Sequence, residues 1–219
     1  MKPLVSCVMP TWNRRAFIGA AIDSFLRQNY ENRELVILDE QENSIEDLVL
    51  EDPRIRYFMA TKRETTGTKR NRVCELAQGE IICHTDDDDW SAPDRIEDQV
   101  KRLIESGKPV TGYSNLLFWD VVEKKAKRYV SHSSGYVCGT SFCYLRSFWE
   151  HHRFRDQQKA SDNSFVYPIL RQVASSSDDR HMVARIHDAH TSSKNGISQV
   201  VDKGVIPVEF WENEKLRLS

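Results

Sequence analysis

Short apolar runs alternate with longer amphipathic segments through the first half of the chain. A continuous apolar run such as Leu4 to Met9 predicts a strand buried on both faces. Apolar residues at helical spacing between Ala16 and Leu26 predict a helix after it. The same patterns predict further strands at Glu34 to Leu38, Arg54 to Met59 and Ile81 to Thr85, and further helices at Ser44 to Leu50, after Thr65 as far as Gly79, and from Pro93 to Gly107. This alternation is typical of an α/β fold with a doubly wound, mostly parallel sheet, whose ligands bind at the carboxyl ends of the strands.

The pattern changes after Pro109, where shorter and more mixed elements follow. The expected elements are strands at Val110 to Trp119 and Arg128 to Ser131, a turn-rich strand region at Gly135 to Leu145, helices at Ser147 to His152 and Ser164 to Val173, a loop at Ala174 to Asp179, a short strand at Met182 to Ile186, and a last apolar patch at Val205 to Trp211. No internal repeat or low-complexity linker separates the two halves. We therefore expect one domain over residues 1–219, with the change of pattern at residue 107.

Composition excludes several classes of protein. The chain has 219 residues, a net charge of −2 and a charged fraction of 29%, so no overall basic field favours nucleic acid or an anionic membrane. No apolar run approaches the length of a membrane span, and the N-terminus lacks a signal-peptide core. The five cysteines are odd in number and irregularly spaced, which is typical of a reducing compartment. We expect a cytoplasmic protein with no integral membrane segment.

Four consecutive aspartates, Asp86 to Asp89, directly follow an apolar run and precede Trp90. Adjacent carboxylates repel one another and persist either by facing water or by sharing a cation. If the run continues the strand, Asp86 and Asp88 point to one side, and Asp87 and Asp89 point to the other. Two carboxylates on one side form a hard-oxygen site suited to Mg²⁺ or Mn²⁺. A solvated acidic loop is the alternative, but the apolar strand before the run favours a cation site.

Two other polar groups follow predicted elements in the same half. Asp39 and Glu40 come directly after the second strand, where a carboxylate could accept a hydrogen bond from a nucleobase N–H or simply end the strand in a turn. Lys69 and Arg70 lie near a predicted helix N-terminus, where the helix dipole and the side chains favour phosphate. Exposed helix charges are the alternative for this pair.

Taken in order, these motifs resemble the family-two nucleotide-sugar glycosyltransferases of GT-A fold. The matching segments are Val5 to Arg14, Val36 to Glu40, Gly67 to Arg72, Ala77 to Ile82, Asp86 to Trp90, Pro93 to Arg95, Gly139 to Phe142, Phe154 to Asp156 and Ser161-Asp162. The resemblance implies a GT-A fold: a Rossmann-like, doubly wound, mostly parallel sheet with a smaller mixed C-terminal half. It also implies that residues 1–107 form a nucleotide-sugar-binding half and residues 108–219 an acceptor-binding half.

The resemblance implies roles for individual residues. It places the donor nucleotide on Pro10, Thr11, Asn13, Asp39, Glu40, Lys69, Arg70, Asp86 and Asp87, and a Mn²⁺ or Mg²⁺ ion on Asp86, Asp88 and Asp89. The spacing of the group His187 to His190, rather than the resemblance, adds His190 as a further candidate ligand of the ion. We favour a UDP-sugar as donor, although Glu40 stands where the family usually has aspartate and leaves the base open. Which aspartate touches the ion directly is also open, with Asp88 favoured. His187, near His190, is a second candidate contact from a closing C-terminal loop.

The family inverts the anomeric carbon, so the resemblance implies a carboxylate that takes the proton of the acceptor hydroxyl. Asp162 occupies that place, although it could instead cap the helix that follows it, and Asp156 is a weaker substitute. The predicted function is a metal-dependent inverting glycosyltransferase whose acceptor is a glycan, lipid, protein or modified nucleobase. Two alternatives remain: the same donor chemistry on a modified DNA base, and a non-catalytic sugar-nucleotide-binding module.

Overall fold

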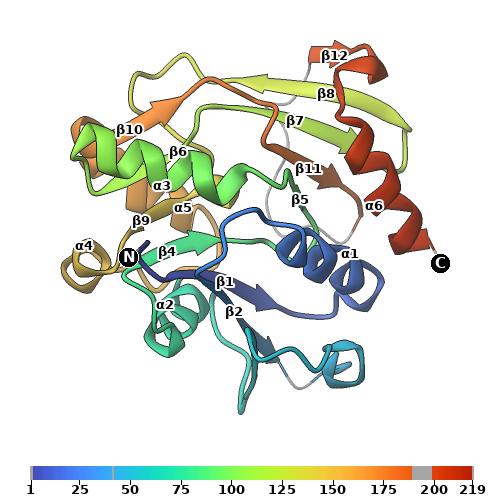
Figure 1. The fold of residues 1–219 in the computed structure, drawn as a ribbon, viewed down its shortest axis with the longest axis horizontal. Helices are drawn as coiled ribbons and strands as arrows, with labels where there is room; N and C mark the ends of the chain where they lie inside the picture. The colour runs from blue at the N-terminus through green and yellow to red at the C-terminus, as the bar shows by residue number, and fades with distance from the viewer. Residues whose placement is uncertain (1, 41, 189–198, 219) are drawn as a thin grey trace.

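A seven-stranded sheet forms the centre of the protein in the computed structural model, which describes residues 2–40, 42–188 and 199–218 (Figure 1). Its strands lie in the order β10 (Val173–Ser176), β6 (Val110–Tyr113), β9 (Cys143–Leu145), β4 (Ile81–His84), β1 (Val5–Thr11), β2 (Arg33–Glu40) and β3 (Ile55–Ala60). Neighbouring strands are parallel except at β9, which runs antiparallel to β4 and β6. The predicted α/β class with a mostly parallel sheet is therefore confirmed.

Helices cover both faces of this sheet. On one face lie α1 (Arg15–Leu26) and α3 (Arg95–Ser106), and on the other lie α2 (Thr66–Leu76), α4 (Arg146–His151) and α5 (Ser161–Val166) (Figure 1). Alternate residues of β1 serve the two cores: Cys7 and Met9 pack with α1 and α3, whereas Val8 packs with α2. Because successive side chains of a strand point to opposite faces, one buried strand supports both layers. The doubly wound arrangement is thus observed.

A second sheet of five strands stands beside the first. It has the order β12 (Gln199–Val201), β8 (Lys125–Val130), β7 (Asn115–Asp120), β11 (Met182–Ile186) and β5 (Trp90–Ser91). The C-terminal helix α6 (Val208–Leu218) packs Phe210 onto this sheet and also contacts α1 (Figure 1). Short 3-10 turns are η1 (Glu46–Leu48), η2 (Gly139–Ser141), η3 (Tyr167–Gln172) and η4 (Lys203–Val205). Strands after residue 107 join both sheets, and the functional division at that residue stays a prediction.

Several predicted elements are wrong in the second half. The expected strand Val110 to Trp119 is broken at Ser114, where the chain leaves the first sheet as β6 and enters the second as β7. The main-chain N–H of Ser114 donates to the carbonyl of Ser176 at 2.7 Å, next to the β6–β10 pairing. Residues 174–176, expected in a loop, therefore belong to strand β10. The apolar patch Val205 to Trp211 includes the start of helix α6.

Two expectations from composition can be compared with the fold. Among the described residues, no helix is both long and apolar enough to cross a bilayer. All five cysteines are buried thiols, and Cys7 and Cys83 lie in the apolar core, where the sequence pattern predicts them. A buried thiol of this kind behaves as a small apolar side chain.

Candidate functional site

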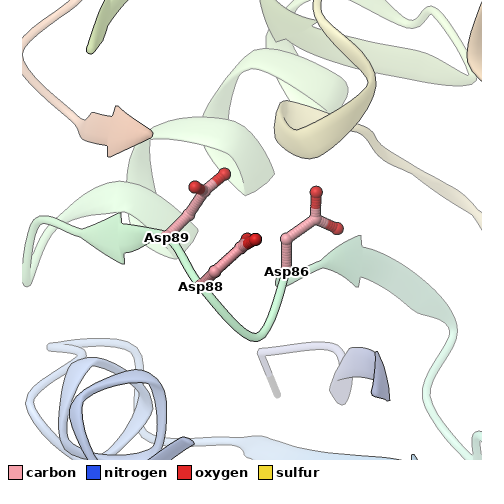
Figure 2. A group of neighbouring side chains, drawn as sticks. All are labelled: Asp86, Asp88 and Asp89. Atoms are coloured by element: carbon pink, nitrogen blue, oxygen red, sulfur yellow. The ribbon is translucent and has the colours of Figure 1, made fainter. Parts of the chain in front are cut away.

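The four aspartates form a turn rather than the end of a strand. Strand β4 ends at His84 and β5 begins at Trp90, so the run does not continue the strand and the alternation expected of a strand does not apply to it. Asp86, Asp88 and Asp89 each offer a carboxylate oxygen within 4.8 Å of the others, and their side chains point the same way from the turn (Figure 2). The turn brings Asp89 to the side of Asp86 and Asp88, where an extended strand would have separated them.

Asp87, the fourth aspartate of the turn, is buried and lies outside this group of three. The Nε atom of Arg14, which precedes α1, lies 3.7 Å from Oδ1 of Asp87 and 3.7 Å from Oδ2 of Asp88. Burial of Asp87 and the nearby charge of Asp88 raise the pKa of Asp87 well above its ordinary value, although Arg14 acts in the opposite direction. Asp87 and Asp88 thus share one guanidinium group, and a cation bound at the turn would reduce the repulsion between their carboxylates.

Groups from the second half hold the turn in place. Asp89 accepts hydrogen bonds from the main-chain N–H of Arg185 at 3.0 Å and from the Thr140 hydroxyl at 2.5 Å. Asp88 Oδ2 lies 3.0 Å from Nε2 of His187, whose ring stacks on Phe17 at 4.5 Å. His187 is thus brought to the acidic turn, whereas His190 lies outside the described residues.

This donor set fits a small divalent cation. Carboxylate oxygens are the ligands that Mg²⁺ and Mn²⁺ prefer, and three of them converge here from one short turn. Asp86 and Asp88 also line the adjoining cavity, so an ion held by them would face whatever occupies it. The residues that could hold Mn²⁺ or Mg²⁺ are therefore Asp86, Asp88 and Asp89, with His187 beside Asp88.

A cavity of about 110 Å³ adjoins the acidic turn at the carboxyl ends of β1 and β2. Its lining includes seven predicted site residues: Pro10, Glu40, Lys69, Arg70, Asp86, Asp87 and Asp88. The lining also includes residues for which the sequence predicts no role in the site: Trp12, Arg14, Arg63, Glu64, Thr66 and Gln158. Trp12 and Arg14 lie within the first motif of the resemblance, so a signal for them existed. The guanidinium carbon of Arg63 lies 3.8 Å from the centroid of the Trp12 ring, and both residues line the cavity.

The second strand ends in two carboxylates with different surroundings. Oδ2 of Asp39 accepts hydrogen bonds from the Ile45 N–H at 3.0 Å and the Tyr57 hydroxyl at 2.8 Å. The other oxygen, Oδ1, is buried and has no hydrogen-bond partner among the described residues. Glu40 is instead engaged, since it accepts from the Glu64 N–H at 2.9 Å and pairs with Lys69 at 3.2 Å.

Three predicted donor contacts, Asp39, Thr11 and Asn13, are not among the residues that line the cavity. Thr11 is buried at the end of β1, and its side chain lies next to that of Asp87. Asn13 is exposed, has a φ of 54° and accepts a hydrogen bond from the Asn43 side chain at 2.8 Å. Asparagine tolerates this left-handed conformation better than most residues, which lets the chain turn from β1 into α1.

Helix α2 carries the basic residues toward the cavity. Thr65 caps it by accepting a hydrogen bond from the Thr68 N–H at 3.3 Å. Arg70 is buried and forms an ion pair with Asp162, while its Nε has no hydrogen-bond partner among the described residues. Asp156 accepts from the hydroxyls of Thr65 and Thr68 at 2.6 and 2.8 Å, so it anchors the start of α2.

Asp162 lies in the first turn of α5, one residue after the helix begins, and Ala160 is the capping residue. The capping alternative for Asp162 is therefore wrong. A Cβ on Gly139 would overlap the carboxyl group of Asp162, so glycine allows η2 to approach this helix closely. The next residue, Thr140, donates to Asp89. Asp162 is thus connected to the acidic turn through η2 and to the cavity through Arg70.

The chain is similar in sequence to several proteins that are named glycosyltransferases. The chain is 43% identical over 99 residues to the putative colanic acid biosynthesis glycosyl transferase WcaA of Escherichia coli, a match that covers 43% of this chain and 36% of WcaA. It is 29% identical over 106 residues to the Escherichia coli UDP-Glc:alpha-D-GlcNAc-diphosphoundecaprenol beta-1,3-glucosyltransferase WfgD, covering 47% of this chain and 42% of WfgD. The chain thus spans less than half of either relative.

Solved structures share the fold at low sequence identity. TarS of S. aureus in complex with UDP-GlcNAc superposes with a TM-score of 0.71 and 17% identity, covering 86% of this chain and 60% of that one. The mannosyltransferase PcManGT of Pyrobaculum calidifontis, in complex with GDP-Man and Mn²⁺, gives a TM-score of 0.63 and 17% identity, covering 85% and 57%. The family model for glycosyl transferase family 2 matches residues 6–176. This range is most of the sequence and includes the acidic turn and the residues that line the cavity. The chain belongs to glycosyl transferase family 2.

Proposed function

We propose that this protein transfers a sugar from a nucleotide-sugar donor to an acceptor hydroxyl, with a divalent cation at the acidic turn. The observation that carries the proposal is the convergence of Asp86, Asp88 and Asp89 beside a cavity that Lys69 and Arg70 also line. A nucleoside diphosphate needs this combination, because its phosphates carry negative charge and its cation prefers oxygen ligands. Both superposed structures are complexes with a nucleotide sugar, UDP-GlcNAc in one and GDP-Man in the other.

The donor pose follows from polar groups that line the cavity and from Asp39, which directly precedes the lining residue Glu40. Oδ1 of Asp39 is a buried acceptor without a partner among the described residues, which suits an N–H of a nucleobase at the end of β2. The unpaired Nε–H of Arg70 and the ammonium of Lys69 suit the diphosphate. We favour a UDP-sugar, with Pro10, Thr11 and Asn13 on the side of the nucleoside.

The transfer step needs a base and a stabilised leaving group. The acceptor oxygen attacks the anomeric carbon, its proton passes to the Asp162 carboxylate, and the bond between that carbon and the diphosphate oxygen breaks, which inverts the configuration. A bound Mn²⁺ or Mg²⁺ supplies positive charge opposite the departing diphosphate. Arg70, which pairs with Asp162, orients the carboxylate.

The test is turnover of a panel of UDP- and GDP-sugars, with and without Mn²⁺, measured as release of the nucleoside diphosphate. We expect release from at least one UDP-sugar and loss of that release when the cation is chelated. Release that continues unchanged in the presence of chelator would contradict the cation's role. A cytoplasmic location rests on the sequence alone and stays a prediction, and the acceptor is open.

A further inference from the structure

Arg185, on strand β11, lies between the acidic turn and the C-terminal helix and is 1% exposed. Its main-chain N–H donates to Asp89 Oδ1, and its Nη1 donates to the carbonyl of Asp88, both at 3.0 Å. One buried residue thus contacts two consecutive members of the turn. A guanidinium group provides donors in a fixed planar arrangement, so its position determines the position of the acceptors it holds.

The other side of the same guanidinium is held by helix α6. Nε of Arg185 donates to Glu214 Oε2 at 2.7 Å, and Nη2 donates to Asn213 Oδ1 at 3.0 Å. Asn213 in turn donates to the main-chain carbonyl of Ala20 at 2.8 Å, which ties α6 to α1. The Phe210 ring lies 5.0 Å from the guanidinium carbon and shields it. Arg185 is therefore a bridge from α6 to the turn.

Glu214 also supports the turn by a second route. Its other oxygen, Oε1, accepts from Arg217 at 2.6 Å, and the Arg217 guanidinium lies over the Phe17 ring at 5.3 Å. Phe17 stacks on His187, which contacts Asp88. Both routes start from one buried carboxylate on α6 and end at Asp88. Four residues of these two routes, Arg185, His187, Glu214 and Arg217, lie beyond residues 6–176, which the family model matches, whereas Phe17 lies within that range.

We propose that Glu214 and Arg185 are a positioning pair that sets the affinity of the acidic turn for its cation. The inference rests on the proposed function, because it takes Asp86, Asp88 and Asp89 as the cation site. Glu214 balances the buried charge of Arg185 and fixes its orientation. Without Glu214, an uncompensated guanidinium would lie against the turn, where its positive charge competes with the cation and its geometry is no longer fixed.

The test compares Glu214→Gln with Glu212→Gln. Both variants remove one negative charge from α6, but the Glu212 side chain is 59% exposed and pairs only loosely with Arg27 at 3.8 Å. Free Mn²⁺ is measured by electron paramagnetic resonance during titration of nucleotide-free protein. We expect the dissociation constant to rise roughly ten-fold in Glu214→Gln, as for other residues that orient metal ligands, and to change less than two-fold in Glu212→Gln.

Two further measurements distinguish an effect on the acidic turn from a loss of overall stability. Arg185→Lys retains the charge and one bond to Glu214 but loses the planar fork, so we expect an intermediate affinity. Amide hydrogen exchange of metal-free protein should be faster over residues 86–91 in Glu214→Gln. A variant that lowers only the melting temperature, with Mn²⁺ affinity and exchange of the turn unchanged, overturns the inference. If wild-type protein binds no Mn²⁺, the proposed function fails, and the exchange measurement still decides whether Glu214 orders the turn.

Discussion

The carboxylate of Asp88 lies between a histidine and an arginine at the edge of the cavity. His187 is 3.0 Å from it and Arg14 is 3.7 Å from it, so two cationic or polar groups face it from different elements. Asp86 and Asp89 add two more carboxylates within 4.8 Å. A carboxylate in such surroundings can exchange protein partners for an ion without leaving its place, which is why the turn is the centre of the proposed chemistry.

Replacing Asp88 by asparagine preserves its shape and removes its charge. We expect Asp88→Asn to lower nucleotide-sugar turnover by on the order of 100-fold or more, since a lost metal ligand removes several kcal/mol of charge stabilisation and each 1.4 kcal/mol is tenfold. Asp47→Asn is the matched control, because that exposed aspartate pairs with Arg15 away from the cavity. Initial rates at saturating Mn²⁺ give the comparison, and equal rates in the two variants would remove Asp88 from the mechanism.

Asp162 and Asp156 offer a direct contrast between two acids of the second half. If Asp162 is the general base, Asp162→Asn should lower transfer by about 10²–10⁴-fold while the affinity for UDP stays within a few-fold of wild type. Asp156 accepts from two threonine hydroxyls at the start of α2, so Asp156→Asn should mainly lower stability, by about 1 kcal/mol. Transfer rates and chemical denaturation measure the two effects. The reverse pattern would assign the base to Asp156.

At the scale of elements, Glu34 connects strands β1, β2 and β3 with the end of α2. Its carboxylate accepts from the Ser6 hydroxyl at 2.5 Å, the Gln78 N–H at 2.7 Å and Arg56 at 2.9 Å. Burial alone would raise the pKa of Glu34, but these hydrogen bonds outweigh it and hold the pKa below its ordinary value of 4.5. The central strands therefore depend on an ionised buried carboxylate.

This shift predicts how stability depends on pH. Because the pKa is lower in the folded state than in the unfolded state, the stabilisation by Glu34 is present above about pH 4.5 and is lost as the pH falls through the folded-state value. We expect Glu34→Gln to lower the free energy of unfolding by ~1–3 kcal/mol at pH 7 and to show a shallower loss of stability between pH 5 and pH 3. Denaturant unfolding across that range measures both, with exposed Glu105→Gln as control. Parallel pH curves for wild type and Glu34→Gln would show that Glu34 makes no such contribution.

The elements also show where sequence patterns stop being informative. Apolar runs predict the buried strands β1, β2 and β4, because strands covered on both faces are mostly apolar, although β2 also buries Glu34. Apolar runs do not predict strand β10, because Ala174, Ser175 and Ser176 are small or polar and pair with β6 through the main chain. The break at Ser114 is equally invisible, because the residues on both sides of it are buried in different sheets.

At the scale of the whole molecule, the site is assembled from both sheets. The acidic turn joins β4 of the first sheet to β5 of the second, and β11 and α6 support it from the C-terminal side. The sequence predicts Glu40 and the aspartates of the cavity because they follow strands whose ends meet at one edge. It predicts Lys69 and Arg70 from their place near a helix N-terminus. The sequence does not predict that Arg185 and Thr140 contact the turn, because these contacts depend on a long-range arrangement, although Thr140 lies within the motif Gly139 to Phe142. A lone arginine within the apolar run Met182 to Ile186 is the signal that could have drawn attention to this position.

The central claim is that a cation at the acidic turn joins the protein to a nucleoside diphosphate. Calorimetric titration of UDP into wild-type protein, with Mn²⁺ and then with Mn²⁺ removed by chelation, tests it most directly. We expect affinity to be at least roughly ten-fold higher with Mn²⁺, which corresponds to about 1.4 kcal/mol of binding free energy, and Asp88→Asn to lose that difference. Equal affinity with and without Mn²⁺ would contradict the account.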